Sequence, residues 1–442
     1  MTMFNIDEFK NRRHQLMQAM GVGIAVIPTA PEVFRNRDSH YAYRFDSYFY
    51  YLSGFKEPES LLVLLAGDVA KDEAPKSILF CRDKDMEREI WDGFRYGADA
   101  ARERFGFDEA YSINDLDAVM LKLLANQQKL FFSLGDSVIW DTRVTGWLNN
   151  LRAQARNGVS VPDDIVDVRK LADEMRMYKS PFEQAAMGRS ASIAAAAHNR
   201  AMQFTRPDRM EYEIEAEFLH AFYRDGAQAP AYTSIVAGGS NACTLHYNAN
   251  NAKLNAGDLL LIDAGCELDG YASDITRTFP VNGKFSAAQK DVYELVLAAQ
   301  FAAIAKVNSQ NHWNVPHEAA LDVLIQGFID FGWCKGSKEA VLESGAYRQF
   351  YMHRTGHWLG LDVHDAGEYK DKQGQWRMLA PSMVLTVEPG CYIRPAENVA
   401  KDFWNIGIRI EDDVLVTEHG CEVLTADALK TVADIEALMK VN

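Results

Sequence analysis

The sequence lacks the features that a secreted or membrane-spanning chain requires. No run approaches the about 18 apolar residues that cross a bilayer. Residues 1–20 form a charged amphipathic stretch without the apolar segment of a signal peptide. The 6 cysteines stand far apart with no CxxC spacing, which predicts scattered thiols rather than disulfides. We therefore expect a cytoplasmic protein.

Positive charge is also scarce. The chain has 46 Lys and Arg against 62 Asp and Glu, which gives a formal net charge of −16. A surface of that sign repels phosphate backbones and anionic lipid. We therefore expect no nucleic acid and no membrane surface among the partners of this protein.

The length and the order of the patterns indicate two domains. A chain of 442 residues can bury a sizeable core. Strand-like runs at 23–27, 60–65 and 130–134 alternate with helical spacing, which predicts an α/β or α+β fold. A polar stretch at 156–164 follows, and Ser180-Pro181 has the composition of a helix start. We place the domains at 1–175 and 176–442.

The second domain is predicted to begin with helices and to continue with strands that contain acids. The predicted helices lie at 168–179, 182–204, 210–225, 286–306 and 315–332, and the predicted strands at 259–265, 271–279, 383–388, 406–411 and 413–417.

Two of these strands form a predicted hairpin with one carboxylate on each arm, Asp263 and Asp274. If the loop centres on Leu268-Asp269, the two acids oppose each other directly; if Asp269-Gly270 forms the turn, Asp263 faces Thr276. Either register places the acids on one face, with their Cβ atoms about 5 Å or roughly 7–8 Å apart. Two like charges that close need a cation or a shared proton, unless the hairpin is an exposed edge with solvated acids.

Three of the 11 histidines, His353, His357 and His364, fall within twelve positions. Gly356 and Gly360 argue against a continuous helix and for a loop that lines a cavity. A single histidine is more often an ordinary core or surface residue, but beside the acids at least one is expected to be a metal ligand.

Two glutamates lie on or after later strands. Glu388 ends an apolar strand at a Pro-Gly break and is expected to be buried. Around Glu411 apolar and charged residues alternate, so Arg409, Glu411 and Asp413 share one face. That face could simply be in water.

Two Asp, two Glu and one His form a ligand set suited to two divalent cations, whose charge balances four carboxylates. Oxygen-rich ligation favours Mn²⁺, with Co²⁺, Zn²⁺ or Fe²⁺ as alternatives. A two-metal site acidifies a bridging water to hydroxide and stabilises a developing oxyanion. Hydrolysis of an amide or ester is the reaction that such a site suits best.

The same residues resemble the five-ligand pattern of the pita-bread metallopeptidases, which include methionine aminopeptidase, prolidase and aminopeptidase P. The pattern consists of Asp263 and Asp274 in IDAGCELDGYASDITRTFPVNGKF, His357 in HWLGLDVHD, Glu388 in VLTVEPG and Glu411 in IGIRIEDD. Three further segments, RNRDSHYAYRFDSYFYYLSGFKEPES, EIWDGFRYG and EMRMYKSPFEQAAM, are similar to bacterial aminopeptidase P, so the resemblance covers nearly the whole chain.

The resemblance implies an α+β protein in which a creatinase-like N-terminal α/β domain precedes a C-terminal pita-bread domain with two pseudo-symmetric halves around a dinuclear metal site. It implies that Asp263 binds one metal ion, that Asp274 and Glu411 bridge both ions, and that His357 and Glu388 complete the second site.

The resemblance also implies substrate-side and supporting roles. His246, in TLHYNAN, is expected near the scissile bond, and His353 and His364 beside the carbonyl or the tetrahedral intermediate. Glu388 is the candidate that accepts the water proton, and Arg409 holds neighbouring ligands in place. Trp91, from the first domain, is expected to close over the pocket.

The activity implied is Xaa-Pro aminopeptidase, which releases the first residue from peptides with proline at the second position. The alternatives are prolidase, which takes only dipeptides, and a non-catalytic pita-bread module that binds peptides or histones. The family often forms dimers or tetramers, so a homo-oligomer is expected. Two segments, Asn308–Asn314 and Lys370–Trp376, depart from the family's pattern: the first lacks a Pro-Gly turn, and the second is an extended polar loop.

Overall fold

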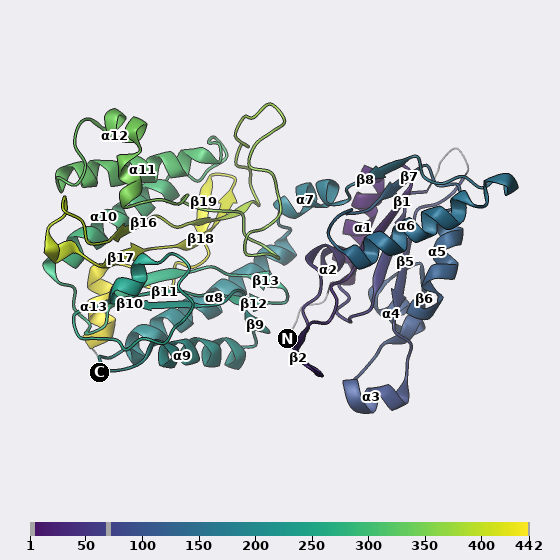
Figure 1. The fold of residues 1–442 in the computed structure, drawn as a ribbon, viewed down its shortest axis with the longest axis horizontal. Coiled ribbons are helices and arrows are strands. Elements are labelled where there is room, and N and C mark those ends of the chain that lie inside the picture. The colour runs from purple at the N-terminus through teal and green to yellow at the C-terminus, as the bar shows by residue number, and fades with distance from the viewer. Residues whose placement is uncertain (1–4, 68–71, 441–442) are drawn as a thin grey trace. The chain divides into compact units, whose positions relative to one another are not determined.

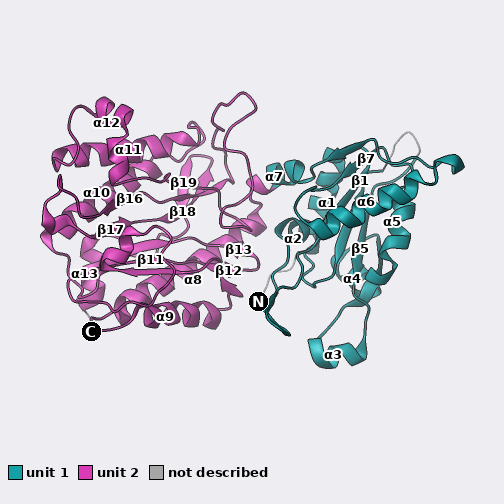
Figure 2. Cartoon of the chain, viewed as in Figure 1, with its two compact units in different colours: residues 1–175 teal, residues 176–442 magenta. Residues whose placement is uncertain are grey.

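The computed structural model of the chain describes residues 5–67 and 72–440, and it divides into two compact units, Met1–Met175 and Arg176–Asn442 (Figures 1 and 2). Both units combine helices with strands, in agreement with the predicted α+β class.

The first unit is built on a six-stranded mixed sheet with the strand order β6-β5-β4-β1-β7-β8. β4 runs antiparallel to both β1 and β5, whereas β1, β7 and β8 are parallel. The strands predicted at 23–27, 60–65 and 130–134 are β1, β4 and β7 of this sheet. Two further strands form a separate two-stranded sheet, and the last helix, α7, crosses the boundary between the units. The strands of the unit are β1 (Ile24–Pro28), β2 (Phe34–Asn36), β3 (Ser39–His40), β4 (Leu61–Leu65), β5 (Lys76–Cys81), β6 (Glu109–Ser112), β7 (Lys129–Phe131) and β8 (Asp164–Val166), and the helices are α1 (Ile6–Met20), α2 (Ser47–Ser53), α3 (Met86–Asp92), α4 (Gly97–Phe105), α5 (Leu116–Leu124), α6 (Val138–Arg152) and α7 (Arg169–Met177).

The second unit repeats one pattern twice: two long helices followed by a three-stranded antiparallel sheet. Helices α8 and α9 precede the sheet β10-β11-β14, and α10 and α11 precede β15-β18-β19. The strands lie between these two helix pairs (Figure 1). The helices are α8 (Pro181–Phe204), α9 (Glu211–Arg224), α10 (Ala287–Ile304), α11 (Asn314–Asp330), α12 (Lys338–Ser344) and α13 (Val432–Lys440), and the strands are β9 (Ala229–Pro230), β10 (Ile235–Gly238), β11 (Leu259–Asp263), β12 (Cys266–Leu268), β13 (Tyr271–Ala272), β14 (Thr276–Pro280), β15 (Val384–Val387), β16 (Gly390–Ile393), β17 (Ile406–Arg409), β18 (Asp412–Thr417) and β19 (Gly420–Val423).

The predicted start of α8 is confirmed in detail. The Ser180 hydroxyl accepts a hydrogen bond from the Glu183 amide, and the Glu183 carboxylate accepts one from the Ser180 amide. Pro181 occupies the first helical position, where its missing N–H costs nothing.

The predicted hairpin has the second of the two registers. Asp269 and Gly270 form the turn with φ of 53° and 86°, and Asp263 pairs with Thr276. The direct opposition of Asp263 and Asp274 is therefore wrong. The continuous strand predicted at 271–279 is also wrong, since β13 pairs in a sheet with β12 and β9, whereas β14 pairs with β11. The two arms of the hairpin approach each other so closely near Gly265 that a Cβ on this residue would lie 1.7 Å from the Ser273 carbonyl oxygen.

The strand near Glu411 does not have a polar face in water. Arg409, Glu411 and Asp413 are only 4 %, 2 % and 1 % exposed. The backbone changes sheets within this segment, because β17 pairs with β16 and β18 pairs with β15 and β19. The alternation of polar and apolar residues therefore separates two buried sides, not a core side from a solvent side.

Candidate metal centre

Five elements of the second unit bring the predicted ligands together. Asp263 ends β11, Asp274 precedes β14, and Glu411 lies between β17 and β18. Glu388 follows β15, and His357 lies on the loop before that strand. Strand ends that meet in this way hold short side chains rigidly, so little order is lost when a ligand binds.

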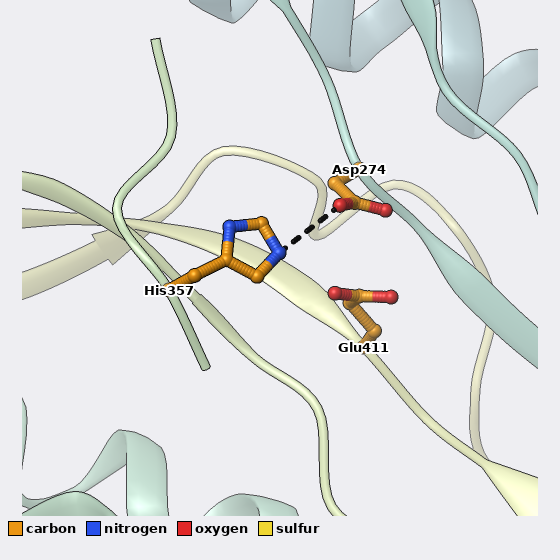
Figure 3. Close-up of side chains that lie close together, drawn as sticks. All are labelled: Asp274, His357 and Glu411. Carbon is orange, nitrogen blue, oxygen red and sulfur yellow. Dashed lines mark ion pairs between the residues drawn. The ribbon is translucent and has the colours of Figure 1, made fainter. Parts of the chain in front are cut away.

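Three of these side chains form the tightest group. One ligand atom from each of Asp274, His357 and Glu411 lies within 4.8 Å of the other two (Figure 3). His357 Nε2 is 3.4 Å from Asp274 Oδ2 and 4.0 Å from Glu388 Oε1. Two carboxylates around one imidazole nitrogen at these separations fit a divalent cation.

Local contacts orient His357. Its amide donates to the Thr386 hydroxyl, and its carbonyl accepts from the Thr386 amide, which joins the loop to β15. A Cβ on Gly356 would lie 2.1 Å from the Thr386 carbonyl, so glycine is needed for this approach. Nδ1 lies 2.9 Å from the Trp358 carbonyl, which can only accept; Nδ1 therefore holds a proton, and Nε2 faces the acids.

Asp274 and Glu411 are buried, whereas Asp263 and Glu388 are half-buried, so the expected full burial of Glu388 is not observed. The enclosure of the four acids shifts their pKa values. Burial, reinforced by the neighbouring carboxylates, raises the pKa of Glu388 to about 7 and that of Glu411 well above its usual range. Burial also raises the pKa of Asp263, although Arg409 opposes this effect. Burial alone would lower the pKa of His357, but Asp274 and Glu388 raise it to about 9. A cluster of acids that resists ionisation is one that a multivalent cation stabilises.

Arg409 supports two of the acids. Its Nη2 donates to Asp263 Oδ2 at 2.6 Å, its Nη1 to the Tyr392 hydroxyl and its Nε to the Thr276 hydroxyl. Thr276 in turn donates to Glu411 Oε2 at 2.7 Å. Arg409 thus contacts Asp263 directly and Glu411 through Thr276, and its supporting role stays a prediction.

The predicted substrate-side histidines share one cavity with these residues. The cavity measures about 680 Å³. Its lining includes His246, His353 and His364, together with Arg409 and the five predicted metal ligands, which are four carboxylates and one imidazole. His353 Nε2 lies 2.8 Å from the Tyr392 hydroxyl, and burial lowers its pKa to about 3. The His364 ring lies 4.2 Å from that of His357.

Trp91 belongs to the first unit. It lies on α3 and its side chain is 83 % exposed. Its expected position over the pocket stays a prediction.

Sequence reasoning missed Tyr232. Its hydroxyl lies 2.6 Å from Asp263 Oδ1 and 2.5 Å from Asp274 Oδ1, and it lines the cavity. Burial and the adjacent acids raise its pKa well above the usual range, so the hydroxyl keeps its proton. Tyr232 precedes β10 in an irregular segment without periodicity, and no pattern in the sequence indicates it.

In the part of the chain that the structure describes, no helix has the length and apolarity that a membrane crossing needs.

Comparisons with known proteins agree with this geometry. Residues 185–418 match metallopeptidase family M24, and residues 9–132 match the N-terminal domain of aminopeptidase P. The chain is 43 % identical to the Xaa-Pro aminopeptidase of Escherichia coli over 99 % of both chains. The structure of Pseudomonas aeruginosa aminopeptidase PepP is similar with a TM-score of 0.96 and 48 % identity, over 100 % of this chain and 99 % of that one. A structure of an E. coli aminopeptidase P variant in complex with substrate has a TM-score of 0.96 and 42 % identity over 99 % of both chains.

The resemblance seen in the sequence is thus confirmed, as is the predicted order of the domains. The chain belongs to metallopeptidase family M24, with an N-terminal domain of the aminopeptidase P type and a C-terminal pita-bread domain.

Proposed function

We propose that this protein is an Xaa-Pro aminopeptidase, a metal-dependent hydrolase that releases the first residue from peptides with proline at the second position. The observation on which this rests is the convergence of Asp263, Asp274, His357, Glu388 and Glu411 on one cavity. Relatives similar over the full chain are named Xaa-Pro aminopeptidase, which favours this activity over that of a prolidase.

The ligand set fits two divalent cations, and we propose Mn²⁺ as the preferred ion, with Co²⁺ or Zn²⁺ as substitutes. Asp263 would bind one ion, Asp274 and Glu411 would bind both, and His357 and Glu388 would complete the second. Oxygen atoms outnumber the single imidazole, which favours Mn²⁺. When bound, such a metal pair acidifies water and stabilises negative charge that develops on a carbonyl oxygen.

Residues of the chain itself would handle the proton and the peptide. Glu388, which lines the cavity beside the other ligands, would accept a proton from the attacking water. His353 and His364 would hold the scissile carbonyl. His353 Nδ1 lies 2.7 Å from the Arg354 carbonyl, which can only accept, so the proton of a neutral His353 is on Nδ1 and Nε2 accepts from the Tyr392 hydroxyl; His353 would donate through Nε2 only as the other tautomer. His246, on the exposed loop before β11, would contact the peptide near the scissile bond.

Proline at the second position has a physical rationale. The bond before proline is a tertiary amide without an N–H, so peptidases that bind that group cannot use it. A cavity shaped for the bent chain and the ring would select this bond.

The test is removal and return of the metal. The protein is stripped with a chelator, Mn²⁺, Co²⁺ or Zn²⁺ is added separately, and release of the first residue is followed from Xaa-Pro-Yaa and from Xaa-Pro. Metal-restored cleavage of the tripeptide is the expected result. Cleavage of the dipeptide alone would indicate a prolidase, and no cleavage with any metal would indicate a peptide-binding module.

We further propose a cytoplasmic homo-oligomer, either a dimer or a tetramer. All six cysteines are free thiols, as is usual in reducing compartments. Helix α3 and the residues after it expose four large apolar side chains, Met86, Ile90, Trp91 and Phe94, a grouping typical of interfaces. Light scattering on the purified protein gives the mass directly.

A further inference from the structure

Two arginines, Arg409 and Arg354, are the only Lys or Arg side chains that line the cavity within the described part of the chain. Arg409 is buried and bound to Asp263. Arg354 is exposed, and among the described residues it forms no ion pair with a carboxylate. The cavity therefore presents one guanidinium whose charge the protein does not neutralise.

The position of Arg354 is fixed by neighbouring side chains. Its Nη2 donates to the Asn314 side-chain oxygen, and its guanidinium carbon lies 5.0 Å from the centre of the Trp376 ring. Trp376 is half-buried and packs against the main core of the unit. A planar cation stacked on an anchored aromatic ring keeps its orientation while its N–H groups stay available.

Asn314 and Trp376 come from the two segments that depart from the family's pattern, Asn308–Asn314 and Lys370–Trp376. Backbone hydrogen bonds from Trp313 to Arg377 and from Leu379 to Asn311 join the first segment to the residues that directly follow the second. Arg354 therefore contacts one residue from each of the two segments that depart from the family's pattern.

The cavity lining contains both the carboxylates of the candidate metal centre and the positive guanidinium of Arg354. The acids of the candidate metal centre would attract the amino end of a peptide and the cations, and a guanidinium repels that amine. Arg354 suits the opposite end, because a guanidinium binds a carboxylate through two parallel hydrogen bonds. In Xaa-Pro-Yaa the terminal carboxylate lies two residues beyond the scissile bond, at most roughly 7 Å along an extended chain. A cavity of about 680 Å³ is large enough for such a peptide.

We propose that Arg354 binds the carboxy-terminal carboxylate of short substrates and so makes this protein prefer tripeptides with a free carboxylate. The inference rests on the proposed function and specifies its substrate class. The net charge of −16 makes the test stringent, since the overall field of the protein favours the cationic C-terminal amide over the zwitterionic peptide acid.

The test compares Xaa-Pro-Yaa with its C-terminal amide on the Mn²⁺-loaded full-length protein. The expected kcat/KM of the acid exceeds that of the amide about tenfold, the size of a charge-assisted contact at an exposed site. In Arg354→Met this ratio falls to about one, and Arg354→Lys, which keeps the charge but loses the paired geometry, gives an intermediate ratio. Arg348→Met removes an exposed arginine outside the cavity and keeps the ratio of the unmodified protein.

Equal rates for acid and amide in the unmodified protein would overturn the inference and leave the proposed function standing. An equal loss on both peptides in Arg354→Met would also overturn it, since Arg354 would then bind a peptide carbonyl. No release from either peptide would overturn the proposed function and the inference with it. Melting temperature and metal content of each variant establish that the comparison is made on folded, loaded protein.

Discussion

Arg409 Nη2 lies 2.6 Å from Asp263 Oδ2, although 146 positions separate the two residues in the chain. The contact joins the strands of the two halves of the second unit, because Asp263 ends β11 and Arg409 ends β17. The guanidinium also donates to Thr276 and Tyr392, so one side chain orients both halves of the candidate metal centre.

Replacing Arg409 should therefore weaken the site without removing a ligand. In Arg409→Lys the ammonium cannot reach all three partners, and Asp263 loses its orientation. We expect kcat/KM or metal affinity to fall about 10- to 100-fold, the usual effect of a residue that holds a ligand. Metal titration and peptide turnover measure both quantities. Full activity in this variant would show that Asp263 is held by its other contacts.

Asp274→Asn should abolish metal-dependent activity while the chain stays folded. The change removes one of the two carboxylates in the group around His357, and we expect a loss of more than about 100-fold. The change removes the repulsion between Asp274 and the acids Asp263 and Glu411, but it also removes the ion pair with protonated His357, so the stability of the metal-free protein should change little. Metal content by mass spectrometry and thermal melting test the two claims, with the exposed Asp402→Asn as control. Normal turnover would contradict the assignment of Asp274 as a ligand.

Metal affinity should fall as the pH falls. Glu388, with a pKa of about 7, and His357, with a pKa of about 9, must each release a proton before they bind a cation. The affinity should thus drop at least about tenfold per pH unit between pH 9 and 7, where His357 is protonated, and more steeply below pH 7, where Glu388 is protonated too; the raised pKa of Glu411 acts in the same direction.

Mn²⁺ titrations across this range measure the slope. The matched variant Glu388→Gln has no proton to release at this position, so its slope should not steepen below pH 7. A slope that is the same in both proteins would mean that Glu388 is ionised throughout.

Asp365 should be required for stability of the loop that holds His357 and His364. Its carboxylate accepts from Arg176 at 2.6 Å and from Lys179 at 2.9 Å, and all three side chains are 1 % exposed. Burial would raise the pKa of Asp365, but the two cations lower it. Asp365→Asn leaves both cations without their buried partner, so the free energy of unfolding should fall by about 3–5 kcal/mol.

Urea unfolding measures that loss, and the exposed Glu343→Gln is a control of the same chemical type. A change below about 1 kcal/mol would show that Asp362, which also accepts from Arg176, compensates.

Local sequence predicted the parts of the fold that depend on neighbours in the chain. The start of α8 follows from Ser180, Pro181 and Glu183, because the cap involves only residues within one turn. The turn residues of the hairpin allow two strand registers, and each of them places Asp263 and Asp274 on one face. The choice between them required β9 and β10, which pair with different parts of the hairpin.

The site follows the same division. The sequence alone determined which residues have ligand chemistry, since carboxylates and imidazoles in apolar strands are costly unless a cation stabilises them. Three features depend on how distant segments pack: the polar side of the Glu411 segment is buried, the Tyr232 hydroxyl lies between Asp263 and Asp274, and the Arg354 guanidinium lies over the Trp376 ring. Those contacts join segments far apart in the chain, and their energies depend on distance and burial, which exist only once the chain has folded.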